Sequence, residues 1–331
     1  MQIDEVDQAL VKKVSCTFVP TEACTDAKES FDILLALGYA AGGLCLLICG
    51  ESGVGKSTLL RWLTQKLIAV RTETGWIRPA IFVEIPTAPT AIAICEALLT
   101  ALGDPRPSAG TRPQKFRRLR EQLVEQQVRL VVLDDLQHVV DRESGRIIFD
   151  ASEAIKQILI EHPMSVVCAG LADSRRVVDS NEQLKRRHMS TISLKRFDWN
   201  KNKSKLSFIA VLAAFARSLS EFEFPDLEDE RVALRFYLGS GGIMDFVFKI
   251  FLLATWFALK AKKKTVGMKE FSKAWKVGLL HSEGVEDPFT MKLEQGDELA
   301  RRVEAAKKIN LPAPRPPSKG KAGSRLREIG L

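Results

Sequence analysis

The residues of this chain best suited to chemistry form a glycine-rich loop that ends in a lysine and a serine. The pattern G-x-x-x-x-G-K-S follows the apolar segment 44–49 and precedes a segment with apolar residues at helical spacing. Backbone N–H groups of such a loop, at the start of a helix, point at phosphate oxygens. Lys56 is expected to reach the β- and γ-phosphates of a nucleotide, and the Ser57 hydroxyl to bind Mg²⁺. The residues expected to bind nucleotide are Gly50, Glu51, Ser52, Gly53, Val54, Gly55, Lys56, Ser57 and Thr58.

Two carboxylates at the end of a second apolar segment complete the predicted site. Asp134 and Asp135 directly follow the apolar residues 130–133. Asp134 is expected to hold the Mg²⁺ shell, and Asp135 to orient and deprotonate the attacking water. Most nucleotide-hydrolysing proteins with such a loop have Glu at the second of these two positions. Asp135 has a shorter side chain, which predicts slow turnover. The phosphate-binding loop and these carboxylates together predict ATP and Mg²⁺ as ligands. The alternative interpretation of the two carboxylates is an acidic turn after a strand.

Apolar strands alternate with helices in the first part of the chain. This order predicts an α/β domain whose parallel sheet is covered by helices on both faces, with nucleotide at the carboxyl ends of the strands. From about residue 203 only helices are predicted, which indicates a small all-helical lid domain. The predicted strands are 44–49, 80–85, 130–133 and 164–169, and the predicted helices include 91–102, 113–127, 147–160, 206–219, 229–238, 243–261 and 268–280.

Four regions are expected along the chain. Residues 1–30 form an N-terminal extension, 31–200 the nucleotide-binding domain, 201–282 the helical lid and 283–331 a flexible basic tail. Most of the net charge of +8 belongs to the last 31 residues, which contain nine Lys or Arg and two Glu. Such a tail suits a phosphate backbone or an acidic partner, or it only keeps the protein in solution.

Length and composition limit the number of domains, the presence of a membrane span and the expected location. A chain of 331 residues with 46% hydrophobic content is long enough for one large or two modest globular domains. The most apolar stretch, residues 243–259, contains Asp245 and Lys249, so no membrane span is expected. The acidic N-terminus does not resemble a signal peptide, and the six cysteines contain no C-x-x-C pair. A cytoplasmic location is expected.

The motifs together resemble one known family. They are the phosphate-binding loop, the run D-D-L-Q-H at 134–138, Ala169-Gly170 and the run N-E-Q-L-K-R-R at 181–187. These resemble the TniB/TnsC regulators of DNA transposition, which are AAA+ ATPases, over about residues 15–280. The resemblance implies an ATP-dependent homo-oligomer, a ring or helical filament on duplex DNA, that marks an insertion target. It also implies two kinds of protein partner, a transposase and a target-selecting protein.

The resemblance assigns further site residues. By its place in N-E-Q-L-K-R-R, Arg187 is the first candidate for an arginine finger reaching a neighbouring subunit, and Arg186 is the second. The expected polar sensor after the fourth strand is replaced by Leu171, and the lid helix lacks the sensor arginine of many AAA+ proteins; both departures fit slow hydrolysis. By analogy, the DNA contacts lie in the segments 87–90 and 110–115. Their candidate residues are Thr90, Thr111, Arg112 and Lys115.

Two other functions are compatible with the sequence. One is a nucleotide-gated adaptor that binds ATP and partner proteins but barely hydrolyses, as Asp135 and Leu171 suggest. The other is a different AAA+ ATPase, such as a helicase loader or a defence-associated ATPase.

Overall fold

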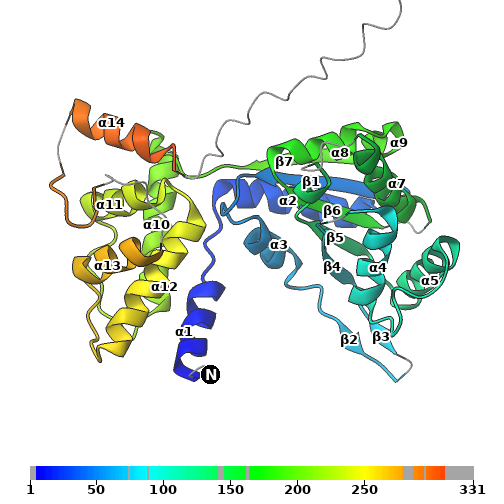
Figure 1. Cartoon of the computed structure of the whole chain (residues 1–331), viewed down its shortest axis with the longest axis horizontal. Helices are drawn as coiled ribbons and strands as arrows, with labels where there is room; N and C mark the ends of the chain where they lie inside the picture. The colour runs from blue at the N-terminus through cyan, green and yellow to red at the C-terminus, as the bar shows by residue number, and fades with distance from the viewer. Residues whose placement is uncertain are drawn as a thin grey trace, which may run out of the picture.

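A five-stranded parallel sheet forms the centre of one half of the molecule (Figure 1). The computed structural model describes residues 5–73, 75–87, 89–140, 145–161, 164–278, 286–293 and 296–309. The strand order is β4-β5-β6-β1-β7, so crossover helices must cover both faces. The strands are β1 (Leu44–Gly50), β4 (Ala80–Glu84), β5 (Leu130–Asp134), β6 (Ser165–Gly170) and β7 (His188–Leu194). The α/β fold expected from the sequence is confirmed.

Alternate side chains of β1 enter two different cores. Leu46 and Ile48 pack with residues of α2 and α3 on one face, and Cys45 and Leu47 pack with residues of α4 and α7 on the other. This explains why β1 reads as a continuous apolar run, because a central parallel strand is buried on both sides. The helices of this domain are α2 (Glu22–Leu37), α3 (Lys56–Thr64), α4 (Ala91–Leu102), α5 (Arg112–Glu125), α6 (Gln137–Val140), α7 (Gly145–Glu161), α8 (Arg175–Asp179) and α9 (Glu182–Arg187), and a short 3₁₀ turn covers Ala172–Ser174.

Several elements of this domain were not predicted, among them α2, β7 and a small hairpin. β7 joins the far side of β1 and pairs with it in parallel from His188 to Leu194. A small antiparallel hairpin, β2 (Val70–Arg71) and β3 (Trp76–Ile77), projects away from the sheet (Figure 1).

The second half of the molecule is helical. It contains α10 (Asn202–Ser218), α11 (Glu230–Ser240), α12 (Met244–Lys260), α13 (Met268–Gly278) and α14 (Asp297–Ala306), and α1 (Glu5–Cys16) packs against it (Figure 1). Its core is rich in aromatic rings: the ring of Phe236 lies 4.8 Å from that of Phe271 and 5.1 Å from that of Phe289, measured between centroids. Aromatic pairs at such distances stabilise a core beyond the apolar area they bury.

The helical half extends further along the chain than expected. Residues 283–331 were predicted to be a flexible tail, yet Phe289, Val303 and Ala306 are buried in the helical core. α14 has apolar residues on only one face, so its sequence alone gives only a weak signal for a buried helix. Helical structure therefore continues at least to α14. Residues 310–331, which carry the rest of the predicted tail, lie outside the described residues.

The N-terminal residues are divided between the two halves. Leu10 and Val14 of α1 are buried in the helical core, whereas Phe31 and Leu34 of α2 pack against the sheet. The boundary expected at residue 30 thus falls inside α2. The segment between α1 and α2 crosses from one half to the other.

The described residues contain no single helix long and apolar enough to span a membrane. α11 and α12 pass that test only as a pair, and they are bent by 109° relative to one another. Both helices bury their apolar faces in the helical core.

Candidate nucleotide site

The phosphate-binding loop connects β1 to α3 and depends on two glycines with positive φ. Gly53 has φ 79° and Gly55 has φ 101°, a region that residues with a side chain rarely adopt. A Cβ atom at Gly53 would lie 2.9 Å from the Asp245 Cβ and 3.0 Å from the Ile243 Cγ2 at the start of α12. The backbone N–H of Asp245 also donates to the Gly53 carbonyl at 3.0 Å. The loop is therefore packed directly against the lid helix.

Lys56 points back into the loop. Its Nζ donates to the backbone carbonyls of Gly50 at 2.9 Å and Glu51 at 2.8 Å, and the residue is 9% exposed. Burial lowers the pKa of Lys56 below the usual value, and the nearby carboxylates of Asp134 and Asp135 act in the opposite direction. A buried ammonium held only by carbonyl oxygens has spare donor capacity, which fits a phosphate group in this loop.

The Ser57 hydroxyl meets the carboxylate predicted to share its metal ion. Ser57 Oγ donates to Asp134 Oδ2 at 2.7 Å, although the two residues lie 77 positions apart. A hydroxyl and a carboxylate are oxygen ligands of the kind Mg²⁺ prefers, and Mg²⁺ usually completes its shell with phosphate oxygens and water. The two residues thus fit a Mg²⁺ ion bound together with a nucleotide. The described residues hold no group of three His, Cys, Asp or Glu side chains that could bind a metal by itself.

Asp135 has an unusual backbone conformation. Its φ is 58°, and its backbone N–H donates to Asp134 Oδ1 at 2.9 Å. Asp and Asn tolerate this left-handed region better than residues with longer side chains. The turn thereby offers a physical reason for Asp where Glu is common. The Asp135 carboxylate is itself held, because Gln137 Nε2 donates to its Oδ1 at 2.7 Å.

The remaining residues of the D-D-L-Q-H run anchor this turn. Leu136 is fully buried, and its backbone N–H donates to the Ala169 carbonyl at the end of β6 at 2.9 Å. The His138 ring meets the Ile85 carbonyl, just beyond β4, at 2.8 Å. The run therefore joins the carboxyl ends of three neighbouring strands.

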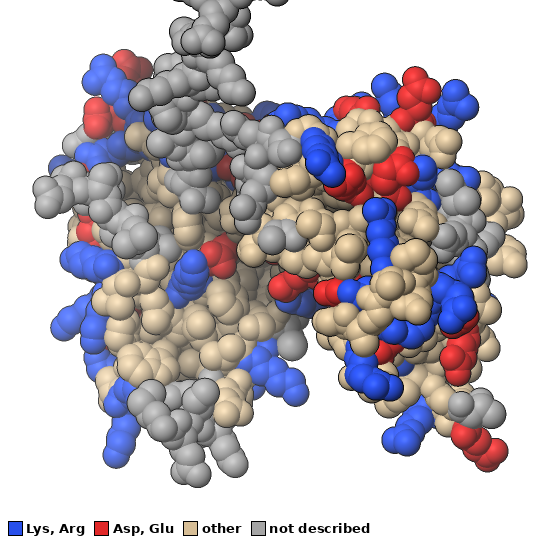
Figure 2. All heavy atoms as spheres, turned by 45° about the vertical axis from the view of Figure 1, so that its right-hand side comes forward, with Lys and Arg blue, Asp and Glu red and all other residues tan. Residues whose placement is uncertain are grey.

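A cleft of about 1070 Å³ runs between the two halves past this loop. Figure 2 shows the seam between the halves as a hollow in the surface. The cleft is lined by residues 51–58 of the phosphate-binding loop and Asp135, by the α1–α2 connection and by Arg196, Tyr237, Met244 and Lys307. It is large enough for a nucleotide, with its polar wall on the loop and apolar groups from the helical half.

Sequence reasoning missed two residues near this site. Ser174, fully buried after β6, lies against Gly170, and within the described part of the chain neither its Oγ nor Gln137 Oε1 has a hydrogen-bond partner. This hydroxyl lies three residues after Leu171, where a polar sensor was expected. Arg196, two residues after β7, contacts Glu51 of the loop. No local pattern marks either residue, because their partners are distant in sequence.

The two candidate arginine fingers differ in their surroundings. Arg187 Nη1 donates to the carbonyls of Gly42 and Gly43, before β1, whereas Arg186 is exposed and has no hydrogen bond or ion pair to other described residues. Both lie at the amino end of β7, next to the amino end of β1. The phosphate-binding loop lies at the other end of β1, about 20 Å away for a strand of this length. Neither side chain can reach the loop of its own subunit.

The four candidate DNA contacts have different environments. Thr90 caps α4 by accepting the Ala93 N–H at 3.1 Å, and Thr111 is the N-cap residue of α5. Arg112 is exposed, with its guanidinium 5.7 Å from the centre of the Phe116 ring. Lys115 is 8% exposed and forms an ion pair with Glu96 at 2.5 Å. Arg112 is thus the cation most accessible to a phosphate, and Lys115 would first have to leave Glu96.

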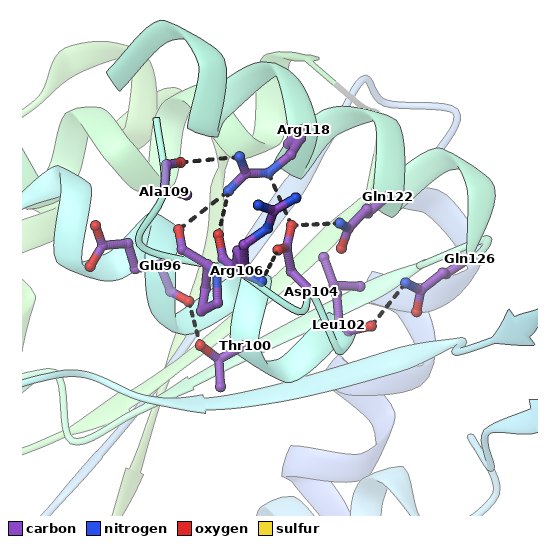
Figure 3. Close-up of polar contacts among 10 residues, drawn as sticks. Glu96, Thr100, Leu102, Asp104, Arg106, Ala109, Arg118, Gln122 and Gln126 are labelled. Carbon is purple, nitrogen blue, oxygen red and sulfur yellow. Dashed lines mark hydrogen bonds and ion pairs between the residues drawn. The ribbon is translucent and has the colours of Figure 1, made fainter. Parts of the chain in front are cut away.

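The loop before α5 is held rigidly by one carboxylate (Figure 3). Asp104 accepts hydrogen bonds from the Arg106 N–H at 2.8 Å, Arg118 Nε at 3.0 Å and Gln122 Nε2 at 2.8 Å. Burial would raise the pKa of Asp104, but these hydrogen bonds outweigh it and keep the pKa below its usual value. Arg118 also donates to the Ala109 carbonyl at 3.1 Å. The segment that leads to Thr111 and Arg112 is therefore ordered before any ligand binds.

The strand order, the loop after β1, the carboxylates after β5 and the helical lid together define an AAA+ protein of the P-loop class. Solved structures show the same fold. Cdc6p from Pyrobaculum aerophilum aligns with TM-score 0.56 and 18% identity, over 85% of this chain and 73% of that one. The Aeropyrum pernix ORC2 protein, solved as ADPNP-ADP complexes, aligns with TM-score 0.60 and 14% identity, over 90% and 84%. A comparison with curated proteins returned no match.

The chain belongs to the TniB family. The sequence profile for the bacterial TniB protein matches residues 14–199, more than half of the chain. The match includes the phosphate-binding loop, Asp134 and Asp135, and both candidate arginine fingers. The family resemblance of the sequence is therefore confirmed.

Proposed function

We propose that this protein is an ATP-dependent regulator of DNA transposition. It binds ATP with Mg²⁺ in the cleft between its two halves and assembles as a ring or helical filament on duplex DNA. The assembly recruits or activates a transposase at a target chosen with a target-selecting protein. Hydrolysis is slow and limits the lifetime of the assembly.

The main support is the joint geometry of Lys56, the Ser57–Asp134 pair and Asp135 in a chain of the TniB family. When bound, Mg²⁺-ATP would supply the phosphoanhydride bond to be cleaved. Lys56 would neutralise phosphate charge, Ser57 and Asp134 would hold the metal ion, and Asp135 would accept a proton from water. Gln137 orients the Asp135 carboxylate for that step.

Three exposed residues near helix starts are the candidate contacts to DNA. Arg112 is exposed beside a rigid loop, and Thr90 and Thr111 lie exposed at helix starts. On the face shown in Figure 2, Lys and Arg side chains are spread over both halves among acidic groups. Contacts to duplex DNA would therefore come from a limited set of residues, repeated in successive subunits.

Electron microscopy of the full chain with duplex DNA tests the assembly. We expect rings or filaments with a non-hydrolysable ATP analogue and none with ADP. Asp135→Asn, which suits the left-handed backbone, should bind ATP, release no phosphate and form assemblies that persist longer with ATP. Lys56→Ala is the matched control that should not assemble. Absence of any DNA-bound assembly with the analogue would overturn the DNA part of the proposal.

A second candidate, a nucleotide-gated adaptor with little hydrolysis, is favoured by one observation. Leu171, at the position where a polar sensor is expected, cannot donate to a γ-phosphate. Steady-state phosphate release with and without DNA distinguishes the two functions. Turnover stimulated by DNA supports the ATPase, whereas stoichiometric ATP binding without turnover supports the adaptor.

A further inference from the structure

Arg196 connects three parts of the molecule that lie far apart in sequence. Its Nε donates to both carboxylate oxygens of Glu51, at 3.1 and 3.0 Å, and its Nη2 donates to the same carboxylate. Its Nη1 donates to the backbone carbonyls of Lys307 and Ile309, both at 2.9 Å. The Arg196 side chain is only 10% exposed. One guanidinium thus joins the phosphate-binding loop to the end of α14.

The end of α14 also packs closely on the lid. A Cβ atom at Gly241, between α11 and α12, would lie 2.5 Å from the Ala306 carbonyl oxygen and 3.1 Å from the Ile309 Cβ. Lys307 forms an ion pair with Asp198 at 3.3 Å, two residues beyond Arg196. Lys307 is the C-cap residue of α14. Carbonyls at the end of a helix carry partial negative charge, so a guanidinium is a favourable partner for the Lys307 carbonyl.

We propose that Arg196 is a positioning residue that couples nucleotide binding at the loop to the docking of the α14 end. This inference rests on the proposed ATP binding and adds a regulated element to it. Nucleotide in the cleft and the docked end of α14 stabilise one another. The state of the site is thereby transmitted to the point from which the basic residues 310–331 continue.

Charge gives the direction of this coupling. Glu51 is a carboxylate within the loop that receives the negatively charged phosphates, and its side chain is 40% exposed. Without Arg196, its charge would repel the nucleotide. The bidentate pair neutralises Glu51 and fixes the guanidinium so that Nη1 faces the α14 carbonyls. Nucleotide bound between the halves would stabilise the arrangement of the two halves described here, in which Arg196 holds the α14 end.

Hydrogen exchange of the full chain tests the coupling. The reporters are the N–H groups of Lys307, Lys308 and Ile309, which donate to carbonyls within the end of α14. We expect a saturating non-hydrolysable ATP analogue with Mg²⁺ to slow their exchange. In Arg196→Met that slowing should be lost and affinity for the analogue should fall by about tenfold, since coupling is reciprocal.

Arg235→Met is the matched control. Arg235 Nη1 also donates to carbonyls of the C-terminal segment, those of Pro288 at 2.6 Å and Met291 at 2.9 Å, but Arg235 does not contact the loop. In Arg235→Met, any change in hydrogen exchange at residues 307–309 should be the same with and without nucleotide. Affinity for the ATP analogue should be unaltered. Glu51→Gln breaks the same link from the loop side, so it replaces Arg196→Met if that variant does not fold. In Glu51→Gln the slowing of exchange by the analogue should also be lost.

The outcomes separate this inference from the proposed function. Affinity for the analogue is measured first, and no binding by the natural chain would overturn both. Binding without any change in exchange at residues 307–309 would overturn the coupling alone. A response retained in Arg196→Met or in Glu51→Gln would do the same.

Discussion

At the scale of single residues, Lys56 is the charge on which the proposed nucleotide binding depends. It is buried, its donors are held by two loop carbonyls, and no other cation belongs to the loop. Asp135 shows the reverse situation, because its backbone conformation suits Asp while the chemistry commonly uses Glu. The candidate site thus contains the cation that phosphate needs, but its proposed base, Asp135, has a shorter side chain than the usual Glu.

Lys56→Ala should reduce affinity for ATP by at least about 100-fold, because a buried charge-assisted contact to phosphate is lost. The natural chain should also lose affinity as pH rises into the alkaline range. Burial lowers the pKa of Lys56 from 10.5, so its charge disappears at a lower pH than that of an ordinary lysine. Titration calorimetry from pH 7 to 10 checks both statements. An unchanged affinity in Lys56→Ala would remove the assignment of the loop.

At the scale of elements, short polar clusters fix the loops on which the candidate sites depend. Asp104, 4% exposed, gathers the loop before α5 and two side chains of that helix (Figure 3). The D-D-L-Q-H run does the same for the ends of β4, β5 and β6. Such clusters explain how irregular segments stay ordered next to a sheet, since most of their polar groups find partners within the protein. Among the described residues, the exceptions in these two clusters are Gln122 Oε1 and Gln137 Oε1.

Asp104→Asn should lower the free energy of unfolding at neutral pH by about 1–2 kcal/mol, because a buried carboxylate with three donors is replaced by an amide. The pKa of Asp104 is lowered in the folded protein, so its stabilisation is present above the ordinary value of 3.8 and is lost as pH falls through the lowered pKa. The two proteins should therefore converge in stability at strongly acidic pH. Urea unfolding across pH measures this difference. Asp26→Asn, at an exposed carboxylate on α2, is the control.

At the scale of the whole molecule, the proposed assembly depends on contacts between subunits, and the helical half depends on contacts along its whole length. The candidate fingers lie at the strand ends opposite their own phosphate-binding loop, so they can act only on a neighbouring subunit. Exposure favours Arg186, because Arg187 is engaged with Gly42 and Gly43 of its own chain.

Arg186→Ala should leave folding and ATP binding intact but abolish hydrolysis in assemblies, because the finger acts across a subunit boundary. Mixing Arg186→Ala with Asp135→Asn subunits should restore part of the phosphate release at interfaces that hold both intact groups. Arg187→Ala should lower the melting temperature. If mixing restores hydrolysis for Arg187→Ala and not for Arg186→Ala, Arg187 is the finger instead.

Two truncations test where the folded molecule ends. A chain that stops after residue 282 loses Phe289, Val303 and Ala306 from the helical core and should melt at a much lower temperature. A chain that stops after residue 309 should melt like the natural protein. It also loses five Lys or Arg, and we expect its DNA affinity to keep the same salt dependence. A slope of log affinity against log salt shallower by about 0.9 per lost contact would show that these residues bind phosphate.

The sequence by itself determined the candidate nucleotide site and most of the sheet. The loop from Gly50 to Thr58 and the pair Asp134 and Asp135 are local patterns whose geometry follows from a few adjacent residues. Three strands, β1, β5 and β6, were predictable because central parallel strands are apolar on both faces. β4 lies at the edge of the sheet and was predictable from its apolar residues 80–83. β7 was not, because its residues are mostly half-buried and include Ser and Thr.

Only the tertiary structure decided which polar residues are available and where the helical half ends. Lys115 resembles a surface cation until Glu96 is found beside it, and α14 resembles part of a basic tail until Phe289 and Gly241 provide its packing surface. Arg196 has partners 145 and 111 positions away, at Glu51 and Lys307. Contacts between residues so distant in sequence leave no local periodicity, because the chain positions them only when its two halves close on the cleft.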